Sequence, residues 1–190
     1  MRRHRVRIIG GELRSRLVTF PDRLGLRPTP DRVRVTLFNW LGQDLTGRTC
    51  LDLFAGSGVL GFEAASRGAS LVVMVERDAE VAAALAENAR ALRTDRVQLL
   101  RADAIEFLAK DPRAFDVVFL DPPYGWPGRA GLLSRVAPHL RPGALVYWEA
   151  AEPLHPPPGW ELWRQGKAGA VHYHLLRTTV SEQGSLSGDV

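Results

Sequence analysis

The stretch Leu51-Asp-Leu-Phe-Ala-Gly-Ser-Gly-Val-Leu-Gly61 determines the fold that this sequence predicts. Its apolar start, residues 51–54, predicts a short buried strand. Gly56 and Gly58 then allow a tight turn and leave room for a ligand, and Gly61 falls where the following helix would press against the sheet. The N-terminus of that helix would face the ligand with unpaired N–H groups. A strand, a glycine turn and a helix form the first unit of a doubly wound nucleotide-binding fold.

The glycine spacing alone does not identify the ligand, because Gly-x-Gly-x-x-Gly also occurs in dinucleotide-binding proteins. Glu76 follows the next expected strand, residues 71–75. An acidic residue at this place suits a ribose with both hydroxyl groups free, which NAD and S-adenosylmethionine share. These residues predict an adenosine cofactor, and a nicotinamide oxidoreductase stays open at this point.

Strands and helices alternate from Cys50 onward, which predicts a mostly parallel sheet with helical crossovers. Seven strands are expected, of which the final one is antiparallel, so the fold class is a Rossmann-like α/β fold. The expected strands lie near residues 51–54, 71–75, 97–100, 115–120, 144–148, 160–163 and 171–176, and the main helices of this part lie near 79–92 and 130–140. Asp103 has Glu106 three residues on, which predicts a capping box at the start of a further helix.

The N-terminal part of the chain predicts a small extension in front of this fold. Residues 5–20 alternate apolar and polar positions around Gly10-Gly11, which is typical of a β-hairpin. Thr29 is expected to cap a following helix whose first residue is Pro30. We therefore expect three parts along the chain, namely a basic extension of residues 1–45, a core of residues 46–178 and a mobile tail of residues 179–190.

The extension is strongly basic. Residues 1–48 carry eleven Arg or Lys and four Asp or Glu, a net charge of +7, whereas the rest of the chain carries −3. Such an end predicts contact with a polyanion, although a solvated arginine-rich surface is the simpler alternative. The predicted phosphate contacts are Arg2, Arg3, Arg5, Arg7, Arg14, Arg16, Arg27, Arg32 and Arg34.

A rigid tetrapeptide, Asp121-Pro-Pro-Tyr124, follows the expected strand at residues 115–120. If that strand neighbours the first one, the tetrapeptide lies beside the reactive end of the cofactor. The two prolines stiffen the backbone and direct carbonyl groups into the cleft. Asp121 and the Pro122 carbonyl could then accept both hydrogens of an exocyclic amine, while Tyr124 offers a face for a stacked base. A simple strand-exit turn is the structural alternative.

The chain resembles the class I S-adenosylmethionine-dependent methyltransferases, through Asp52-Leu-Phe-Ala-Gly-Ser-Gly58 and through Asp121-Pro-Pro-Tyr124. It is most similar to the bacterial 16S ribosomal RNA guanine-N2 methyltransferases, and this likeness runs from about residue 7 to residue 177. The segments that carry the closer likeness are Arg7-Ile-Ile-Gly-Gly11, Leu26-Arg-Pro-Thr29, Asp31-Arg-Val-Arg34 and Leu37-Phe-Asn-Trp-Leu41. Two residues depart from the family pattern: Val35 replaces a usual acidic residue, and Ser15 replaces a usual glycine.

The resemblance implies methyl transfer from S-adenosylmethionine to guanine N2 in 16S rRNA, or in a 30S assembly particle, by a monomer that needs no metal. It implies that Glu76 holds the ribose hydroxyls and Asp103 the adenine amino group. The implied catalytic residues are Asp121, Pro122, Pro123 and Tyr124. The implied cofactor-binding residues are Asp52, Phe54, Ala55, Gly56, Ser57, Gly58, Glu76, Asp103, Ala104 and Asp121. Alternatives are an adenine-N6 methyltransferase with the same pocket and a non-catalytic RNA-binding factor of ribosome assembly.

Other features limit the cellular setting and the chemistry. No apolar run approaches the length that spans a bilayer, and the arginine-rich start lacks the apolar segment of a signal peptide. We therefore expect a cytoplasmic protein with no membrane partner. Cys50 is the only cysteine, so no internal disulfide is expected. His172 and His174 lie two residues apart without a third ligand nearby, and no metal site is expected there.

Overall fold

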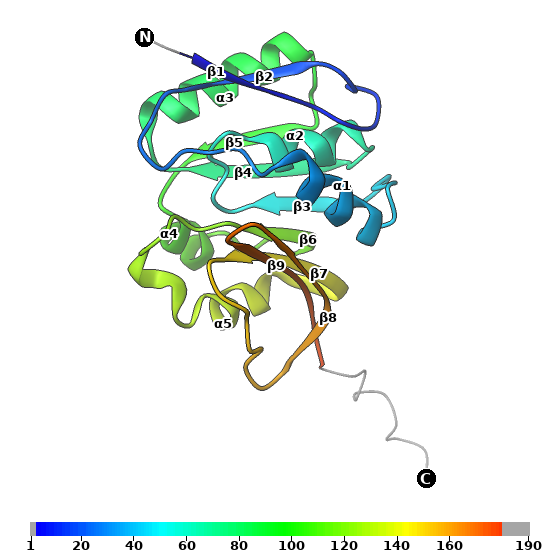
Figure 1. Ribbon diagram of the computed structural model, residues 1–190, viewed down its shortest axis with the longest axis vertical. Helices are drawn as coiled ribbons and strands as arrows, with labels where there is room; N and C mark the ends of the chain where they lie inside the picture. The colour runs from blue at the N-terminus through cyan, green and yellow to red at the C-terminus, as the bar shows by residue number, and fades with distance from the viewer. Residues whose placement is uncertain (1–2, 180–190) are drawn as a thin grey trace.

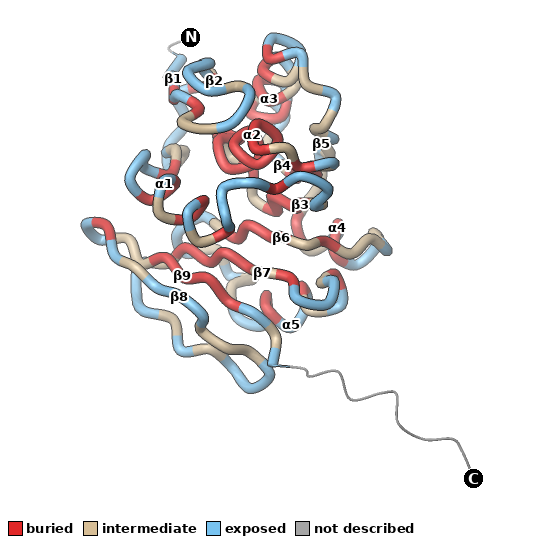
Figure 2. The backbone as a smooth tube through the Cα atoms, turned by 90° about the vertical axis from the view of Figure 1, so that its right-hand side faces the viewer, coloured by how far each residue is buried: buried red, intermediate tan, exposed pale blue. Residues whose placement is uncertain are grey.

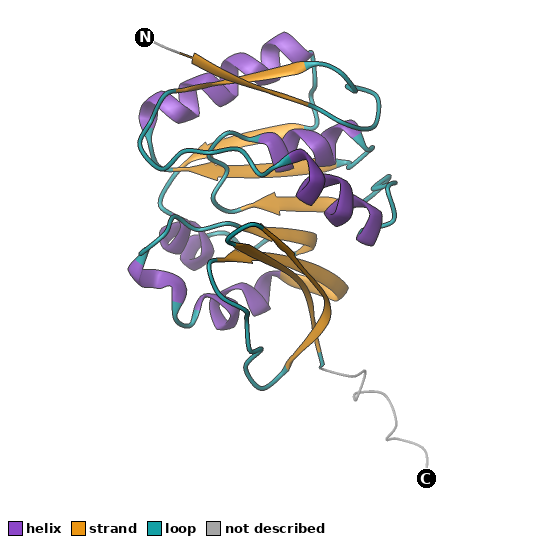
Figure 3. Ribbon diagram, viewed as in Figure 1, coloured by secondary structure: helices purple, strands orange, loops and turns teal. Residues whose placement is uncertain are grey.

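The computed structural model describes residues 3–179 as a two-stranded hairpin and a seven-stranded sheet with helices on both faces (Figures 1 and 3). The strands are β1 (Arg3–Arg7), β2 (Leu17–Pro21), β3 (Thr49–Asp52), β4 (Leu71–Glu76), β5 (Val97–Arg101), β6 (Phe115–Leu120), β7 (Leu140–Ala150), β8 (Trp160–Ala168) and β9 (Val171–Thr178). The helices are α1 (Asp31–Trp40), α2 (Val59–Ser66), α3 (Ala79–Leu92), α4 (Ala104–Lys110) and α5 (Leu132–Val136).

The large sheet has the strand order β5-β4-β3-β6-β7-β9-β8. The first five strands in this order are parallel, and β9 lies antiparallel between β7 and β8. The chain runs outward from β3 through β4 to β5, then returns to form β6 on the other side of β3. The strand order therefore reverses between β3 and β6, where proteins of this kind bind their ligands. The predicted Rossmann-like fold with an antiparallel final strand is confirmed.

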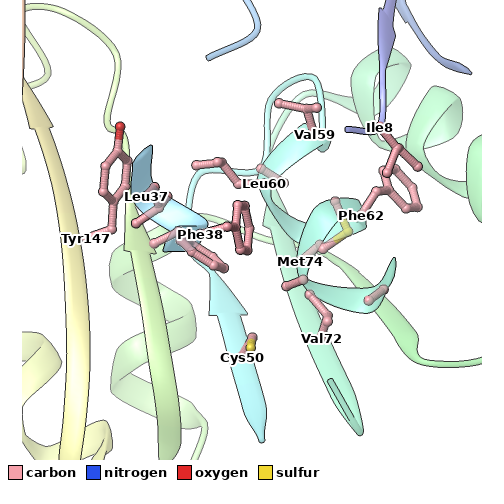
Figure 4. Packing of buried hydrophobic residues seen from close by; sticks show 14 of the residues in the cluster. Ile8, Leu37, Phe38, Cys50, Val59, Leu60, Phe62, Val72, Met74 and Tyr147 are labelled. Atoms are coloured by element: carbon pink, nitrogen blue, oxygen red, sulfur yellow. The ribbon is translucent and has the colours of Figure 1, made fainter. Parts of the chain in front are cut away.

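The core lies on both faces of this sheet. On one face α1, α2 and α3 cover side chains such as Cys50, Met74 and Tyr147, which Figure 4 shows together with Phe38 of α1. On the other face α4 and α5 cover a second apolar cluster, which includes Leu51. Figure 2 shows that β6 is almost continuously buried and that β7 and β9 each contain a buried stretch. A strand buried on both faces explains why these segments read as apolar runs in the sequence.

The hairpin packs on the same core as α2 and α3. One cluster with residues of the sheet and its helices includes the buried hairpin residues Val6, Ile8, Val18 and Phe20. Figure 4 shows the Ile8 side chain next to Phe62 of α2. The loop between β1 and β2 is longer than a two-residue turn, because it spans residues 8–16. The predicted hairpin is confirmed, and the proposed boundary between residues 45 and 46 stays a prediction.

Ser15 adopts a left-handed backbone conformation with φ of +71°. Its N–H donates to the Ile8 carbonyl over 2.8 Å, and this hydrogen bond helps to close the hairpin loop. Glycine reaches positive φ without steric cost, whereas serine does so with strain. This explains physically why glycine suits the position where this chain has Ser15.

The start of α1 differs from the prediction by one residue. Pro30, not Thr29, is the N-cap, and the Pro30 carbonyl accepts hydrogen bonds from the N–H groups of Val33 and Arg34. Thr29 is buried, and its carbonyl accepts a hydrogen bond from Nε of Arg34. The Arg34 side chain therefore holds Thr29 just outside the helix, and the predicted Thr29 cap is wrong.

The helix expected near residues 130–140 is also shorter than predicted. After α5 the chain forms a 3-10 turn, Ala137–His139, and then enters β7 at Leu140. Pro138 cannot donate the N–H that would continue an α-helix, which explains the early end.

Two further predictions concern the chain end and membranes. The tail expected at residues 179–190 lies outside the described part of the chain, apart from its first residue, Thr179. The Thr179 N–H donates to the Gly159 carbonyl over 2.9 Å. Within residues 3–179, no helix has both the length and the apolar character for crossing a membrane.

Candidate cofactor and catalytic site

The glycine turn that follows β3 needs its glycines. Gly56 and Gly58 have φ of +50° and +78°. A Cβ atom on Gly58 would lie 2.3 Å from Leu85 and 2.9 Å from Met74, and one on Gly61 would lie 3.0 Å from Met74. The turn and the start of α2 therefore press directly on β4 and α3. The predicted close approach of helix and sheet at Gly61 is confirmed.

Asp52 supports this turn from inside the sheet. Its side chain is buried, and Oδ2 accepts a hydrogen bond of 3.1 Å from the N–H of Gly61 in the first turn of α2. Burial raises the pKa of Asp52 to about 7, while the Gly61 hydrogen bond acts in the opposite direction. Asp52 thus fixes the helix N-terminus behind the glycine turn.

Glu76 lies at the end of β4 and reaches the same turn. Its Oε2 accepts a hydrogen bond of 3.0 Å from Gly56, and its Oε1 accepts one of 2.8 Å from Asp78. These two N–H groups fix the carboxylate beside the glycine turn. Carboxylate oxygens have further lone pairs, so Glu76 can still accept hydroxyl groups of a ribose.

Asp103 caps α4, at the end of the neighbouring strand β5. Its Oδ1 accepts hydrogen bonds from Ile105 at 2.8 Å and from Glu106 at 3.3 Å. The predicted cap is confirmed, but the Glu106 side chain pairs with Lys110 at 3.5 Å, as an exposed i,i+4 pair. Both cap bonds use one oxygen of Asp103. The assignment of Asp103 and the buried Ala104 to the adenine stays a prediction.

Four neighbouring strands end in a carboxylate on one face of the sheet. The register pairs Asp52 with Met74 and Phe119, and it pairs Phe119 with Tyr147. These aligned residues share one face of the sheet. The side chains two residues after Met74, Phe119 and Tyr147 lie on the same face. We call the resulting set the carboxylate row, which consists of Glu76 of β4, Asp52 of β3, Asp121 just after β6 and Glu149 of β7.

The electrostatics of the row show how close these groups lie. Desolvation raises the pKa of Asp121 well above its usual value, and the charges of Glu149 and Asp52 raise it further. Desolvation also raises the pKa of Glu149. The hydroxyl of buried Tyr147 donates to Oε2 of Glu149 over 2.7 Å. Sequence reasoning missed Glu149, although the alternation along the fifth parallel strand places it beside Asp121.

Arg129 joins the Asp121-Pro-Pro-Tyr124 loop to β7, and sequence reasoning missed it too. Its guanidinium donates to the Pro122 carbonyl and to the Glu149 carbonyl, each over 3.1 Å, and it lies 5.4 Å from the Trp148 ring centroid. One lone pair of the Pro122 carbonyl is therefore used within the protein. The second lone pair remains, so the expectation that this carbonyl accepts a hydrogen of the substrate amine stays a prediction.

The loop after β6 touches the glycine turn through two aromatic rings. Trp126 meets Phe54 edge-on, with ring centroids 5.0 Å apart and an interplanar angle of 72°. Tyr124 is 69% exposed, so its ring is free for a stacked base, and Pro123 is exposed beside it. The structure thus brings the two predicted motifs together, because β6 pairs directly with β3.

Arg34 is not available for RNA. It is fully buried, and its guanidinium contacts Glu63, Asp31 and the carbonyls of Arg7 and Thr29. The prediction that it contacts a phosphate is wrong, because the contacts of its guanidinium lie inside the protein. The exposed arginines among the predicted set are Arg3, Arg5, Arg7, Arg14, Arg16, Arg27 and Arg32, and Arg2 lies outside the described residues.

Two of these exposed arginines have partners on α3. Arg3 donates to Glu87 over 2.7 Å, and Arg16 donates to the Ala91 carbonyl over 2.8 Å. His174 of the predicted histidine pair is buried, where it accepts from the Leu154 N–H and contacts the Trp148 carbonyl.

A glycine turn at the reversal point of a parallel sheet, with an aspartate loop from the adjoining strand, is the arrangement of Rossmann-like methyltransferases. The family model described as "Conserved hypothetical protein 95" matches residues 6–177. The chain is 41% identical to "Ribosomal RNA small subunit methyltransferase D" of Escherichia coli K12 over 193 residues, which cover 97% of this chain and 94% of that protein. It therefore belongs to this family, and the resemblance inferred from its motifs is confirmed.

Solved structures agree with this assignment. The E. coli protein yhhF superposes with a TM-score of 0.84 at 37% identity, covering 94% of this chain and 100% of that one. A T. thermophilus 16S rRNA N2 methyltransferase superposes with a TM-score of 0.68 at 24% identity, covering 93% of this chain and 50% of that one. The second likeness shows the shared fold alone.

Proposed function

We propose that this protein transfers a methyl group from S-adenosylmethionine to the exocyclic N2 of a guanine in 16S rRNA, in the cytoplasm. The observation that carries this proposal is the position of Asp121-Pro-Pro-Tyr124, directly beside the glycine turn at the reversal point of the sheet. The family relative named for small-subunit rRNA supports the substrate class.

The residues of the site fit a cationic adenosine cofactor. The carboxylate row gathers acidic side chains at the reversal point of the sheet, and acidic groups favour a sulfonium and an ammonium group over a neutral ligand. We propose that Glu76 accepts the ribose hydroxyls, and the hydrogen bonds from the N–H groups of Gly56 and Asp78 support this by fixing its carboxylate. When bound, S-adenosylmethionine supplies an electrophilic methyl group. Gly58 keeps the glycine turn close to the core beside this ligand, since any side chain there would collide with Leu85.

Asp121 orients the amine that receives the methyl group. It directly follows β6, which pairs with β3 before the glycine turn, and Arg129 fixes the following Pro122 by its carbonyl. Accepting an N2 hydrogen turns the nitrogen lone pair toward the methyl group, and such alignment lowers the barrier of a two-reactant step. Tyr124 is exposed for stacking on the extruded guanine. Catalysis then comes from alignment and does not need a strong base.

The hairpin, the loop that follows it and the start of α1 provide the surface for RNA. Arg5, Arg7, Arg14, Arg27 and Arg32 are exposed, and no acidic side chain is paired with them among the ion pairs of residues 3–179. Unpaired guanidinium groups can bind phosphate oxygens bidentately. We propose that they hold 16S rRNA, alone or in a 30S assembly particle, while the protein acts as a monomer.

The test is methyl transfer from labelled S-adenosylmethionine to 30S particles from cells that lack this protein, followed by nucleoside analysis. We expect N2-methylguanosine with the wild type and a loss of at least about 100-fold with Asp121→Ala, because alignment of the amine is lost. Asp95→Ala, at an exposed aspartate in the turn before β5, is the matched control and should keep full activity.

Other outcomes separate the alternatives. Formation of N6-methyladenosine would keep the pocket and overturn the guanine assignment. Calorimetry with S-adenosylmethionine distinguishes the remaining cases, since we expect the wild type and the Asp95→Ala control to bind it equally well. A wild type that does not bind this cofactor would exclude the enzyme and leave a non-catalytic RNA-binding factor.

A further inference from the structure

Asp121 and Glu149 stand side by side at the ends of two paired strands. The parallel register of β6 and β7 ends with Phe119 opposite Tyr147 and Leu120 opposite Trp148. The next pair in this register is Asp121 and Glu149. Neighbouring strands lie about 4.8 Å apart, and both side chains share the face of the carboxylate row. The two carboxyl groups are therefore direct neighbours, and Glu149 is buried while Asp121 is half-buried.

The groups around this pair do not balance its charge. Arg129 is the cation at the pair, and its guanidinium hydrogen bonds go to the backbone carbonyls of Pro122 and Glu149. Asp52 adds a third carboxyl from β3. Tyr147 donates its hydroxyl hydrogen to Glu149, which favours the ionised form of Glu149 over that of Asp121. Two like charges in such a site resist simultaneous ionisation.

We propose that Glu149 is a positioning residue for the methyl transfer, which raises the proton affinity of Asp121 so that Asp121 accepts the proton lost from N2. This inference rests on the proposed function. The N2 lone pair forms the new N–C bond while the S–C bond breaks and its electron pair stays on sulfur. The nitrogen then carries a positive charge and gives one proton to the Asp121 carboxylate, which restores the neutral amine. Asp121 later releases that proton to solvent.

A neighbour of this kind makes Asp121 a better acceptor for the proton that is lost after the transfer. An isolated aspartate has a pKa of about 4 and is a weak base at neutral pH. General bases work best when their pKa lies near the working pH. Glu149 moves Asp121 in that direction, since ionised Glu149 and desolvation both favour the protonated Asp121.

The test compares the pH dependence of single-turnover methylation in the wild type, Glu149→Gln and Arg129→Gln. Loss of the Glu149 charge should shift the acid limb of the rate profile to lower pH by at least about one unit. Loss of the Arg129 cation should shift the limb to higher pH, whatever its effect on the maximal rate. Glu152→Gln, three residues beyond Glu149 and exposed, is the control and should leave the limb unchanged.

A second readout needs neither cofactor nor RNA. Titration of the aspartate carboxyl carbons by 13C NMR, with Asp121→Asn to assign the signal, should show Asp121 titrating at lower pH in Glu149→Gln than in the wild type. An Asp121 titration or an acid limb that does not move in Glu149→Gln would overturn the proposal. A wild type that forms no N2-methylguanosine would instead overturn the proposed function, while the NMR titration still reports on the pair.

Discussion

The substitution Glu63→Gln should strongly destabilise this protein, because it removes the charge at the centre of a buried ion cluster. Glu63 of α2 is fully buried, and so is its partner Arg34 of α1, with Nη1 2.5 Å from Oε1 of Glu63. Oε1 of Glu63 also accepts the Ile9 N–H at 2.6 Å, and Oε2 lies 3.4 Å from Nε of Arg67. One carboxylate thus joins α1, α2 and the hairpin.

The magnitude follows from the charge that is left behind. Removing one partner of a buried pair costs about 3–5 kcal/mol, because the remaining charge stays desolvated. Glutamine keeps the shape and can still accept the Ile9 N–H, and Arg34 keeps Asp31 and two carbonyls. We therefore expect the lower end, about 3 kcal/mol, out of a total unfolding free energy of about 5–15 kcal/mol.

Urea unfolding followed by tryptophan fluorescence measures this loss. Glu161→Gln is the matched control: Glu161 pairs with Arg177 over 2.7 and 3.0 Å, but both side chains are nearly half exposed. An exposed pair contributes about 0–1 kcal/mol. If Glu63→Gln lost no more stability than Glu161→Gln, the reasoning about the buried cluster would be refuted.

Three further predictions concern pH, packing and salt. Since the pKa of Asp52 is raised to about 7, the folded protein holds its proton more tightly than the unfolded chain. The free energy of unfolding of the wild type therefore falls as pH rises from 5 to 8, because Asp52 ionises in the folded protein only at a cost. Asp52→Asn lacks this loss, so in urea unfolding its stability relative to the wild type should rise by about 2–3 kcal/mol over that range. Gly11→Ala should cost at least about 2 kcal/mol, because φ is +74° and the new Cβ would lie 1.8 Å from the Ser66 carbonyl oxygen. Arg5→Gln and Arg7→Gln should each lower the slope of log K for RNA against log salt by about one in filter binding.

Each of these has its own check. An Asp52→Asn difference that does not change with pH would contradict the first. Gly25→Ala is the control for the second, since φ is +83° there but no atom lies within 4 Å of the added Cβ, so its cost should be only about 1 kcal/mol. An RNA affinity that does not respond to salt would contradict the third.

The sequence predicted the fold well because the deciding signals are local. The apolar strand before Gly56, the spacing to Gly61 and the prolines after Asp121 each act on the backbone within a few residues. The alternation of strands and helices then predicted a mostly parallel sheet, but it did not give the order of the strands. Asp121 was expected beside the glycine turn on the condition that its strand neighbours the first one, and the pairing of β6 with β3 meets this condition.

Other parts of the site depend on contacts between distant segments. Arg34 looks like any arginine on a basic helix, and only Glu63, 29 residues later, explains its burial. Arg129 bonds to Pro122 and Glu149 because of the path of the loop after β6, which no periodicity encodes. The cap at Pro30 shifted for a similar reason, since Arg34 draws the Thr29 carbonyl out of the helix.

Helix α2 has a consequence as a spacer between two surfaces. Its N-terminal end carries the glycine turn, and its C-terminal end holds the hairpin, where Oγ of Ser66 donates to the Gly10 carbonyl and accepts the Leu13 N–H. The helix has eight residues and is about 12 Å long. One residue inserted within it would turn Glu63 and Ser66 by about 100° relative to the glycine turn. The length of α2 therefore fixes the distance between the arginine-rich hairpin and the reacting atoms. An insertion or deletion in α2 would change the position of the hairpin relative to the glycine turn.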